Sequence, residues 1–152
     1  MISSPTQRVI GFTRELRSLD EWLTDPCAET RLFSVTGIGG IGKTTLLMEL
    51  AHRSRQSAAL TLWLDGQFEL STSGAFLAGL EMSLETEYGR SREPTIPLQP
   101  YVVSELSRQR TVLLIDNCET IDRLEGWLLS SFLPKLQAAQ VLLICASRNG
   151  LP

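Results

Sequence analysis

A glycine-rich segment with a single lysine is the part of this sequence that most clearly predicts a chemistry. Residues 37–44 read Gly-Ile-Gly-Gly-Ile-Gly-Lys-Thr and match the pattern G-x-x-x-x-G-K-[ST] in full. Glycines let the backbone curl so that several N–H groups point at phosphate oxygens, and a following helix adds its positive N-terminal end. Lys43 and Lys135 are the only lysines among 14 basic residues. The segment therefore predicts the binding of a nucleotide's phosphates.

The side chains of this segment suggest distinct roles. Lys43 is expected to reach the β- and γ-phosphates, and the Thr44 hydroxyl is expected to ligate Mg²⁺. The alternative, a glycine-rich turn with an accidental lysine, accounts poorly for a full match between a predicted strand and a predicted helix. The predicted nucleotide contacts in this segment are Gly37, Gly39, Gly40, Ile41, Gly42, Lys43, Thr44 and Thr45.

An acidic residue at the end of a later predicted strand is a candidate metal ligand. Asp116 follows the apolar run Val112–Ile115, and a carboxylate at the tip of a buried strand beside a phosphate loop can hold Mg²⁺, directly or through water. Glu119 could act as a general base on the attacking water, or could be a solvated charge that opens the next helix. Asn117 could orient a water or cap that helix. Asp116 is thus predicted to share the metal with Thr44.

Alternating strands and helices must position these residues. Apolar runs predict strands, and 3.6-residue spacing predicts helices between them. Continuous apolar strands separated by helices indicate an α/β three-layer sandwich, a parallel sheet covered on both faces. Ligands of such sheets bind at the carboxyl ends of the strands, where the glycine-rich segment, Asp116–Glu119 and Ser147–Arg148 fall. The predicted strands are 31–36, 58–64, 111–116 and 140–145, and the predicted helices are 13–25, 43–53, 72–88, 100–108 and 121–136.

Composition excludes several classes of protein. With 152 residues and 43% hydrophobic residues, the chain is expected to form about one globular domain. A net charge of −3 leaves no electrostatic footprint for nucleic acid. No segment approaches a membrane span and no signal peptide precedes the domain, so we expect a cytoplasmic protein without membrane contact. One histidine and three widely spaced cysteines favour buried free thiols over a zinc site or disulfides.

Three motifs together resemble a known family. Gly37–Leu46 (GIGGIGKTTL), Leu113–Glu119 (LLIDNCE) and Leu142–Arg148 (LLICASR) are similar to motifs of the STAND class of P-loop ATPases, the group that contains the NB-ARC and NACHT domains. Upstream, Val9–Leu23 (VIGFTRELRSLDEWL) resembles the hhGRxxEL element of that class. The resemblance covers residues 9–152, and residues 1–8 are expected to form a flexible arm.

The resemblance implies further roles and a fold. Val9, Ile10 and Gly11 would contact the adenine, and Arg148 would be the sensor-1 residue that reads the γ-phosphate, rather than an ordinary surface arginine. Together with Lys43, Asp116 and Glu119, Arg148 would form the catalytic set. The fold would be that of the ASCE or AAA-like P-loop ATPases, in which the sensor-1 strand is inserted between the strands of the phosphate loop and Asp116. Members are typically slow ATP/ADP switches that self-oligomerise and carry effector and sensor domains.

The sequence departs from the family pattern at several points. Phe12 stands where an arginine usually follows the upstream glycine, and Asp116-Asn117 replaces the two adjacent aspartates of plant-type relatives. The family's fifth strand, helical lid and winged helix would follow Pro152, so we expect this chain to be part of a larger protein. A non-hydrolysing nucleotide-binding interaction module and, with less support, a small-molecule P-loop kinase are the alternatives; a GTPase is disfavoured because the sequence has no N-K-x-D motif.

Overall fold

The computed structural model describes residues 13–36, 40–66, 72–118 and 122–147 of the chain. Its centre is a parallel four-stranded sheet with the strand order β1-β4-β3-β2. The order confirms the prediction that the strand leading to Arg148 lies between the strand before the glycine-rich segment and the strand that ends at Asp116. The strands are β1 (Arg31–Thr36), β2 (Leu60–Asp65), β3 (Thr111–Asp116) and β4 (Val141–Ser147).

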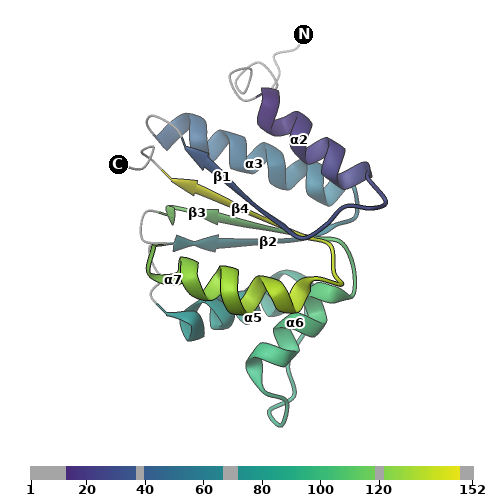
Figure 1. Ribbon diagram of the computed structural model, residues 1–152, viewed down its shortest axis with the longest axis vertical. Helices are drawn as coiled ribbons and strands as arrows, with labels where there is room; N and C mark the ends of the chain where they lie inside the picture. Colours follow the sequence, from purple (N-terminus) through teal and green to yellow (C-terminus); the bar gives the residue numbers. More distant parts are fainter. Residues whose placement is uncertain (1–12, 37–39, 67–71, 119–121, 148–152) are drawn as a thin grey trace.

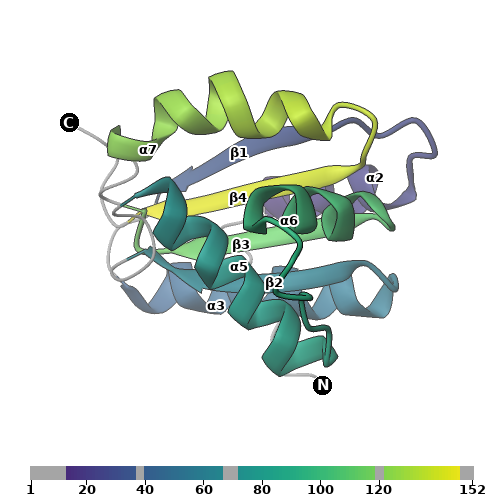
Figure 2. The same cartoon turned by 90° about the horizontal axis from the view of Figure 1, so that it is seen from below.

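Helices cover both faces of the sheet, as the continuous apolar strands predicted (Figure 1). On one face lie α2 (Thr13–Thr24) and α3 (Gly40–Gln56). Figure 2 shows the opposite helical layer in front of the sheet, with the strands running β1, β4, β3, β2 behind it. That layer consists of α5 (Ser73–Tyr88), α6 (Leu98–Ser107), α7 (Asp122–Trp127), the π-helix η3 (Leu128–Phe132) and the 3₁₀-helix η4 (Leu133–Leu136).

The two central strands supply both hydrophobic cores, because successive side chains of a strand point to opposite faces. Leu113 and Leu143 pack with the helices of the α5 layer. Leu114 and Ile144, their neighbours in the chain, pack with α2 and α3. Every residue of β4 is buried, as is every residue of β3 before Asp116. The strands are therefore rigid supports for whatever lies at their ends.

The edge strand β1 corrects one expectation. The sequence predicted a buried strand, but Arg31 and Ser34 are exposed, Leu32 and Phe33 are half-buried, and Val35 alone among Arg31–Val35 is buried. The cause is its place in the sheet, since β1 pairs with β4 and with no other strand of the described part of the chain.

Several element boundaries also differ from the predictions. The helix α3 begins at Gly40 instead of Lys43, and β2 begins at Leu60 because Ala58 turns the chain in a left-handed conformation, with φ 64°. The helix expected at 121–136, which Pro134 was expected to bend or split, is divided over the described residues 122–136 into α7, η3 and η4. Pro134 lies in the first turn of η4, and its missing N–H removes the hydrogen bond that would continue a regular α-helix.

Two of the three cysteines are buried, which agrees with the prediction of buried thiols. Cys118 and Cys145 are buried thiols, as predicted, whereas Cys27 is an exposed thiol. Cys27 lies in the short turn between α2 and β1, outside the two apolar strand regions that bury the other two. Over the described ranges, no helix is both long enough and apolar enough to cross a membrane.

Candidate functional site

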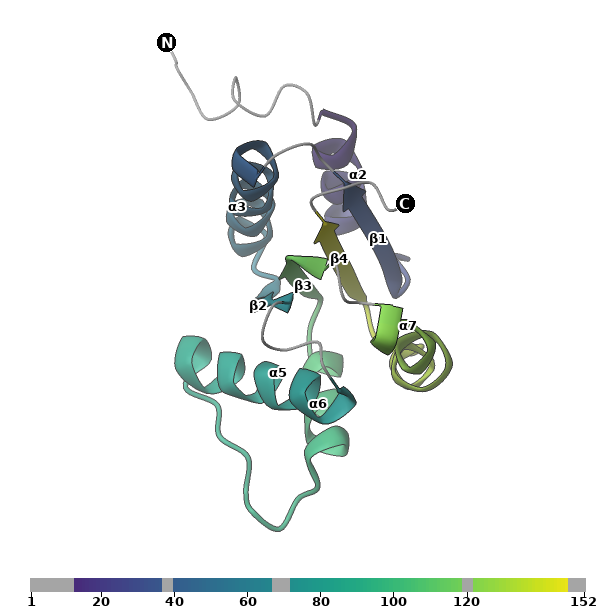
Figure 3. The ribbon, with the colours of Figure 1, turned by 90° about the vertical axis from the view of Figure 1, so that its left-hand side faces the viewer.

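The carboxyl ends of the four strands meet at one edge of the sheet. Figure 3 looks onto this edge, and in Figure 1 the four arrowheads lie together on the left. Thr36 of β1 is in register with Ser147 of β4, and Asp65 of β2 is in register with Asp116 of β3. Because ligands of open parallel sheets bind at this edge, the residues that follow these four ends form the candidate site.

The N-terminus of α3 lies at this edge, and residues 37–39 separate it from the end of β1. The first N–H groups of a helix have no partner within the helix and carry the positive end of its dipole, which favours bound phosphate. Because α3 begins at Gly40, the backbones of Gly40, Ile41, Gly42 and Lys43 form the first turn of the helix. The Thr44 side chain is exposed and that of Thr45 is half-buried. Gly37 and Gly39 lie outside the described residues.

The helix α3 is held firmly behind this N-terminus. Its inner face is fully buried, with Leu46, Leu47 and Leu50 against the sheet. In its last turns, Arg53 pairs with Glu49 at 3.0 Å and with Asp20 of α2 at 2.5 Å. The orientation of the α3 N–H groups is therefore set by the core and by α2.

Asp116 stands at the end of a completely buried run and is itself half-buried. The backbone N–H of Asn117 donates to Asp116 Oδ1 at 2.9 Å. The Asn117 side chain donates from Nδ2 to Asp65 Oδ1 at 3.2 Å. Asn117 has a left-handed backbone, with φ 57°, instead of the extended conformation typical of a helix N-cap. A chain of hydrogen bonds thus connects the ends of β2 and β3.

Asp65 was not singled out in the sequence, although a signal for it existed. It is the polar residue that ends an apolar strand, as Thr36, Asp116 and Ser147 are at the same edge, and it is followed by glycine. Its importance depends on the register of β2 with β3, which the sequence alone does not reveal.

The donor set fits Mg²⁺ better than a metal held by protein alone. Among the described residues there is no group of three or more His, Cys, Asp or Glu side chains that could hold a metal ion. Thr44 and Asp116 offer hard oxygen atoms at the same edge of the sheet. Mg²⁺ is commonly bound by one or two protein oxygens, with phosphates and waters completing its octahedron. The residues present are compatible with that mode.

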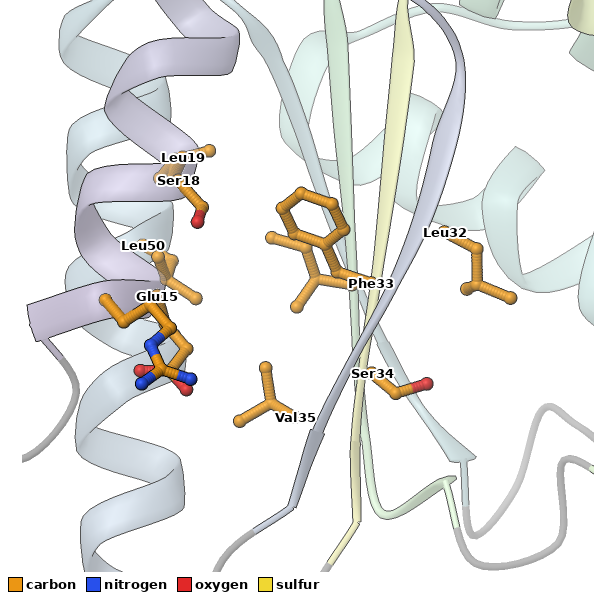
Figure 4. Close-up of a pocket in the computed structure, with 10 residues that line it drawn as sticks. Glu15, Ser18, Leu19, Leu32, Phe33, Ser34, Val35 and Leu50 are labelled. Atoms are coloured by element: carbon orange, nitrogen blue, oxygen red, sulfur yellow. The ribbon is translucent and has the colours of Figure 1, made fainter.

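A pocket of about 290 Å³ lies between α2 and β1 (Figure 4). Phe33 and Val35 point from β1 toward α2, and Glu15 and Ser18 of α2 line the opposite wall. Arg14 also lines this pocket. The walls combine apolar strand side chains with polar groups of α2, on the side of the sheet that also carries α3.

Five further predicted site residues lie outside the described residues. They are Val9, Ile10 and Gly11 of the predicted adenine element, the candidate base Glu119 and the candidate sensor Arg148. Their roles remain predictions. The described structure brings together the start of α3, Asp116 and the end of β4, which leads toward Arg148.

Comparison with known proteins identifies the fold. No protein-family model matches this sequence, and no curated protein matches it. A chain of the Drosophila ORC bound to DNA matches with a TM-score of 0.66 and 19% identity, over 91% of this chain and 37% of that chain. Domain III of the Thermotoga maritima replication initiation protein DnaA matches with a TM-score of 0.51 and 17% identity, over 91% of this chain and 52% of that one.

A second Drosophila structure, ORC bound to GC-rich DNA and Cdc6, matches with a TM-score of 0.62 and 17% identity, over 95% of this chain and 25% of that chain. The chain therefore spans from a quarter to about half of the chains that it resembles. At such identities the similarity concerns the fold. The fold is the parallel α/β sandwich of the AAA+/ASCE P-loop domains, as predicted.

Proposed function

We propose that this chain is the ATP- and ADP-binding core of a STAND-type signalling ATPase. The observation that carries the proposal is that G-x-x-x-x-G-K-[ST] directly follows β1 and its residues from Gly40 onward form the N-terminus of α3, in a sheet where β4 separates β1 from β3. That strand order puts Asp116 two strands away from the phosphate loop, at the same edge. The similarity to AAA+/ASCE domains supports nucleotide binding through this loop.

The nucleotide's phosphates would be held by the chain's own donors. The N–H groups at the start of α3 and of the preceding glycines would donate to phosphate oxygens, and Lys43 would neutralise the β- and γ-phosphates. Thr44 and Asp116 would hold Mg²⁺, directly or through water. When bound, Mg²⁺ would supply charge neutralisation at the β- and γ-phosphate oxygens.

The finer parts of the proposal depend on the motifs that resemble the STAND class. Val9–Gly11 would contact adenine, and Arg148 would read the γ-phosphate from the end of β4. Glu119 would accept the proton of an attacking water. ATP and ADP would favour different states of a larger protein that oligomerises, with Mg²⁺ as the cofactor. The net charge of −3 supports a nucleotide over nucleic acid as the ligand.

Slow hydrolysis is part of this proposal. In-line attack needs a positioned water and neutralised γ-phosphate in a site that excludes bulk water. The candidate groups are Lys43, Thr44, Asp116, Glu119 and Arg148, and no arginine finger can be assigned. We expect turnover well below the range of about 1–100 s⁻¹ that is typical of kinases.

Nucleotide selectivity tests the proposal. ATP, ADP and GTP would each be titrated into the 152-residue chain by isothermal calorimetry, in Mg²⁺ and again in EDTA. We expect ATP and ADP to bind more tightly than GTP, and Mg²⁺ to strengthen the binding. A clear preference for GTP, or no binding of any nucleotide, would refute the assignment.

A further inference from the structure

The ends of β2 and β3 are connected by side chains that the phosphate-loop motif does not include. Asp65 and Asp116 occupy paired positions on neighbouring parallel strands, whose backbones lie about 4.8 Å apart. The two carboxylates would repel each other if nothing stood between them. Asn117 supplies hydrogen bonds to both, from its side-chain Nδ2 to Asp65 Oδ1 and from its backbone N–H to Asp116 Oδ1.

The orientation of the Asn117 amide is fixed by chemistry. An ionised carboxylate only accepts hydrogen bonds, so the NH₂ group and not the amide oxygen must face Asp65. The backbone of Asn117 is left-handed, which asparagine tolerates better than most residues but which still costs free energy. The contact with Asp65 stabilises this conformation, and this conformation directs the Asn117 N–H at Asp116.

We infer that Asp65 is a positioning residue for the Mg²⁺ of the nucleotide site, acting through Asn117 to fix the rotation of the Asp116 carboxylate. The inference rests on the proposed function, because Asp116 is a metal ligand only there. Asp65 touches neither nucleotide nor metal in this arrangement. Its hydrogen bond fixes Asn117, and the Asn117 N–H fixes the Asp116 oxygen Oδ1.

The surroundings of the trio make such control effective. Leu64 before Asp65 and Ile115 before Asp116 are buried in the core, so the backbones of both strands are immobilised up to their last residues. The three polar residues are half-buried, where a hydrogen bond to a charged group contributes more than it does in open water. Groups that orient a metal ligand commonly change metal affinity by about tenfold or more when they are removed.

The test measures Mg²⁺ dependence separately from nucleotide binding. ADP affinity would be determined by calorimetry over a series of Mg²⁺ concentrations and in EDTA, for the wild-type chain and for Asp65→Ala. We expect Asp65→Ala to raise the Mg²⁺ concentration for half-maximal enhancement by about three- to tenfold, with ADP affinity in EDTA unchanged. Electron paramagnetic resonance of Mn²⁺ in place of Mg²⁺ should show a matching loss of bound metal.

Three variants separate positioning from folding. Asp65→Asn keeps an oxygen that can accept from Asn117, so it should recover most of the wild-type Mg²⁺ response. Asn117→Ala loses the link to Asp65 and disfavours the left-handed backbone that directs the N–H at Asp116, so it should reproduce the Asp65→Ala shift even if Asp65→Ala folds poorly. Glu85→Ala removes an exposed carboxylate of α5 and should change nothing.

Each outcome has a distinct meaning. Wild-type Mg²⁺ dependence in both Asp65→Ala and Asn117→Ala, with the wild-type chain binding ADP normally, would overturn the positioning role and leave the proposed function intact. Equal losses of ADP affinity in Mg²⁺ and in EDTA would show a merely structural role for Asp65 and would also overturn the inference. Failure of the wild-type chain to bind ADP would remove the proposed function and the inference together.

Discussion

Arg110 connects the end of α2 to the start of β3 by hydrogen bonds, so its replacement should lower the free energy of unfolding. Its guanidinium donates from Nη1 to the carbonyl of Trp22 and from Nη2 to the carbonyl of Asp25, the latter at 2.8 Å. It also lies 5.2 Å from the centroid of the Trp22 ring. The last turn of α2 contains no basic residue of its own, so Arg110 supplies the cation that a helix C-terminus favours.

The expected cost of Arg110→Ala follows from these contacts. Two hydrogen bonds from a half-buried charged donor contribute about 1 kcal/mol each, and the cation–π contact adds about 0.5 kcal/mol. The free energy of unfolding should therefore fall by about 2–3 kcal/mol. For a domain of this size, that lowers Tm by about 5–10 °C. Arg110→Lys keeps the charge but loses the planar fork, so it should lose roughly half as much.

Thermal and urea unfolding followed by far-ultraviolet circular dichroism would measure these changes. Arg108→Ala is the matched control, because Arg108 lies two residues away and its side chain is 62% exposed in an ion pair with Glu105. The Glu105 carboxylate also pairs with Arg90 at 3.2 Å, so it keeps a cationic partner in this control. A contact made by an exposed arginine contributes about 1 kcal/mol or less, so the control should shift Tm only slightly. An Arg110→Ala shift no larger than that of Arg108→Ala would refute the reasoning.

Three further predictions concern turnover, alkaline stability and thiol reactivity. Glu119→Gln should abolish single-turnover phosphate release while ATP binding stays near wild type; an unchanged rate removes Glu119 from the mechanism. Burial, and after it the Glu105 carboxylate, raises the pKa of Tyr101 above 10.0 in the folded protein. As the pH rises above about 10, Tyr101 therefore ionises in the unfolded chain before it does so in the folded one, and the free energy of unfolding should fall. Tyr101→Phe should abolish that fall in stability at high pH. Because the Tyr101 hydroxyl is buried with no hydrogen-bond partner in the described part of the chain, the same substitution should leave Tm unchanged at pH 7. A marked fall in Tm would contradict this. Cys27 alone should react rapidly with a thiol reagent in the native protein, with the other two cysteines reacting on unfolding; fast reaction of all three in native buffer would contradict the burial.

The strands were the most predictable part of the fold. The bounds of Arg31–Thr36 and Thr111–Asp116 agree with the prediction at both ends, because each apolar run is bounded by charged or turn-forming residues. The interruption of the helix over residues 121–136 was less accessible. Pro134 indicated that the helix is bent or split. Whether the backbone forms a kink or successive π and 3₁₀ turns depends on how Phe132 and Trp127 stack against each other.

The motifs of the candidate site can be recognised in the sequence, whereas the contacts that connect its residues cannot. The glycine-rich segment and Asp116 are local patterns whose chemistry can be inferred from residue types. The contact of Asn117 with Asp65 joins residues 52 positions apart and exists only through the pairing of β2 with β3. The left-handed backbone of Asn117 is likewise set by the turn after β3, and no spacing of residue types announces it.

The two lysines of the chain provide the most direct test of the central claim, that a nucleotide's phosphates bind at the start of α3. Lys43→Ala removes the cation of the phosphate loop, whereas Lys135→Ala removes an exposed lysine from η4, which leads to the opposite edge of the sheet. Calorimetric titration of Mg²⁺ and ATP into both variants isolates the site, since each loses the same charge. Loss of one charge-assisted phosphate contact of about 1.5–3 kcal/mol should weaken ATP binding about ten- to hundredfold in Lys43→Ala and leave Lys135→Ala unchanged. Equal ATP affinity in the two variants would contradict the account.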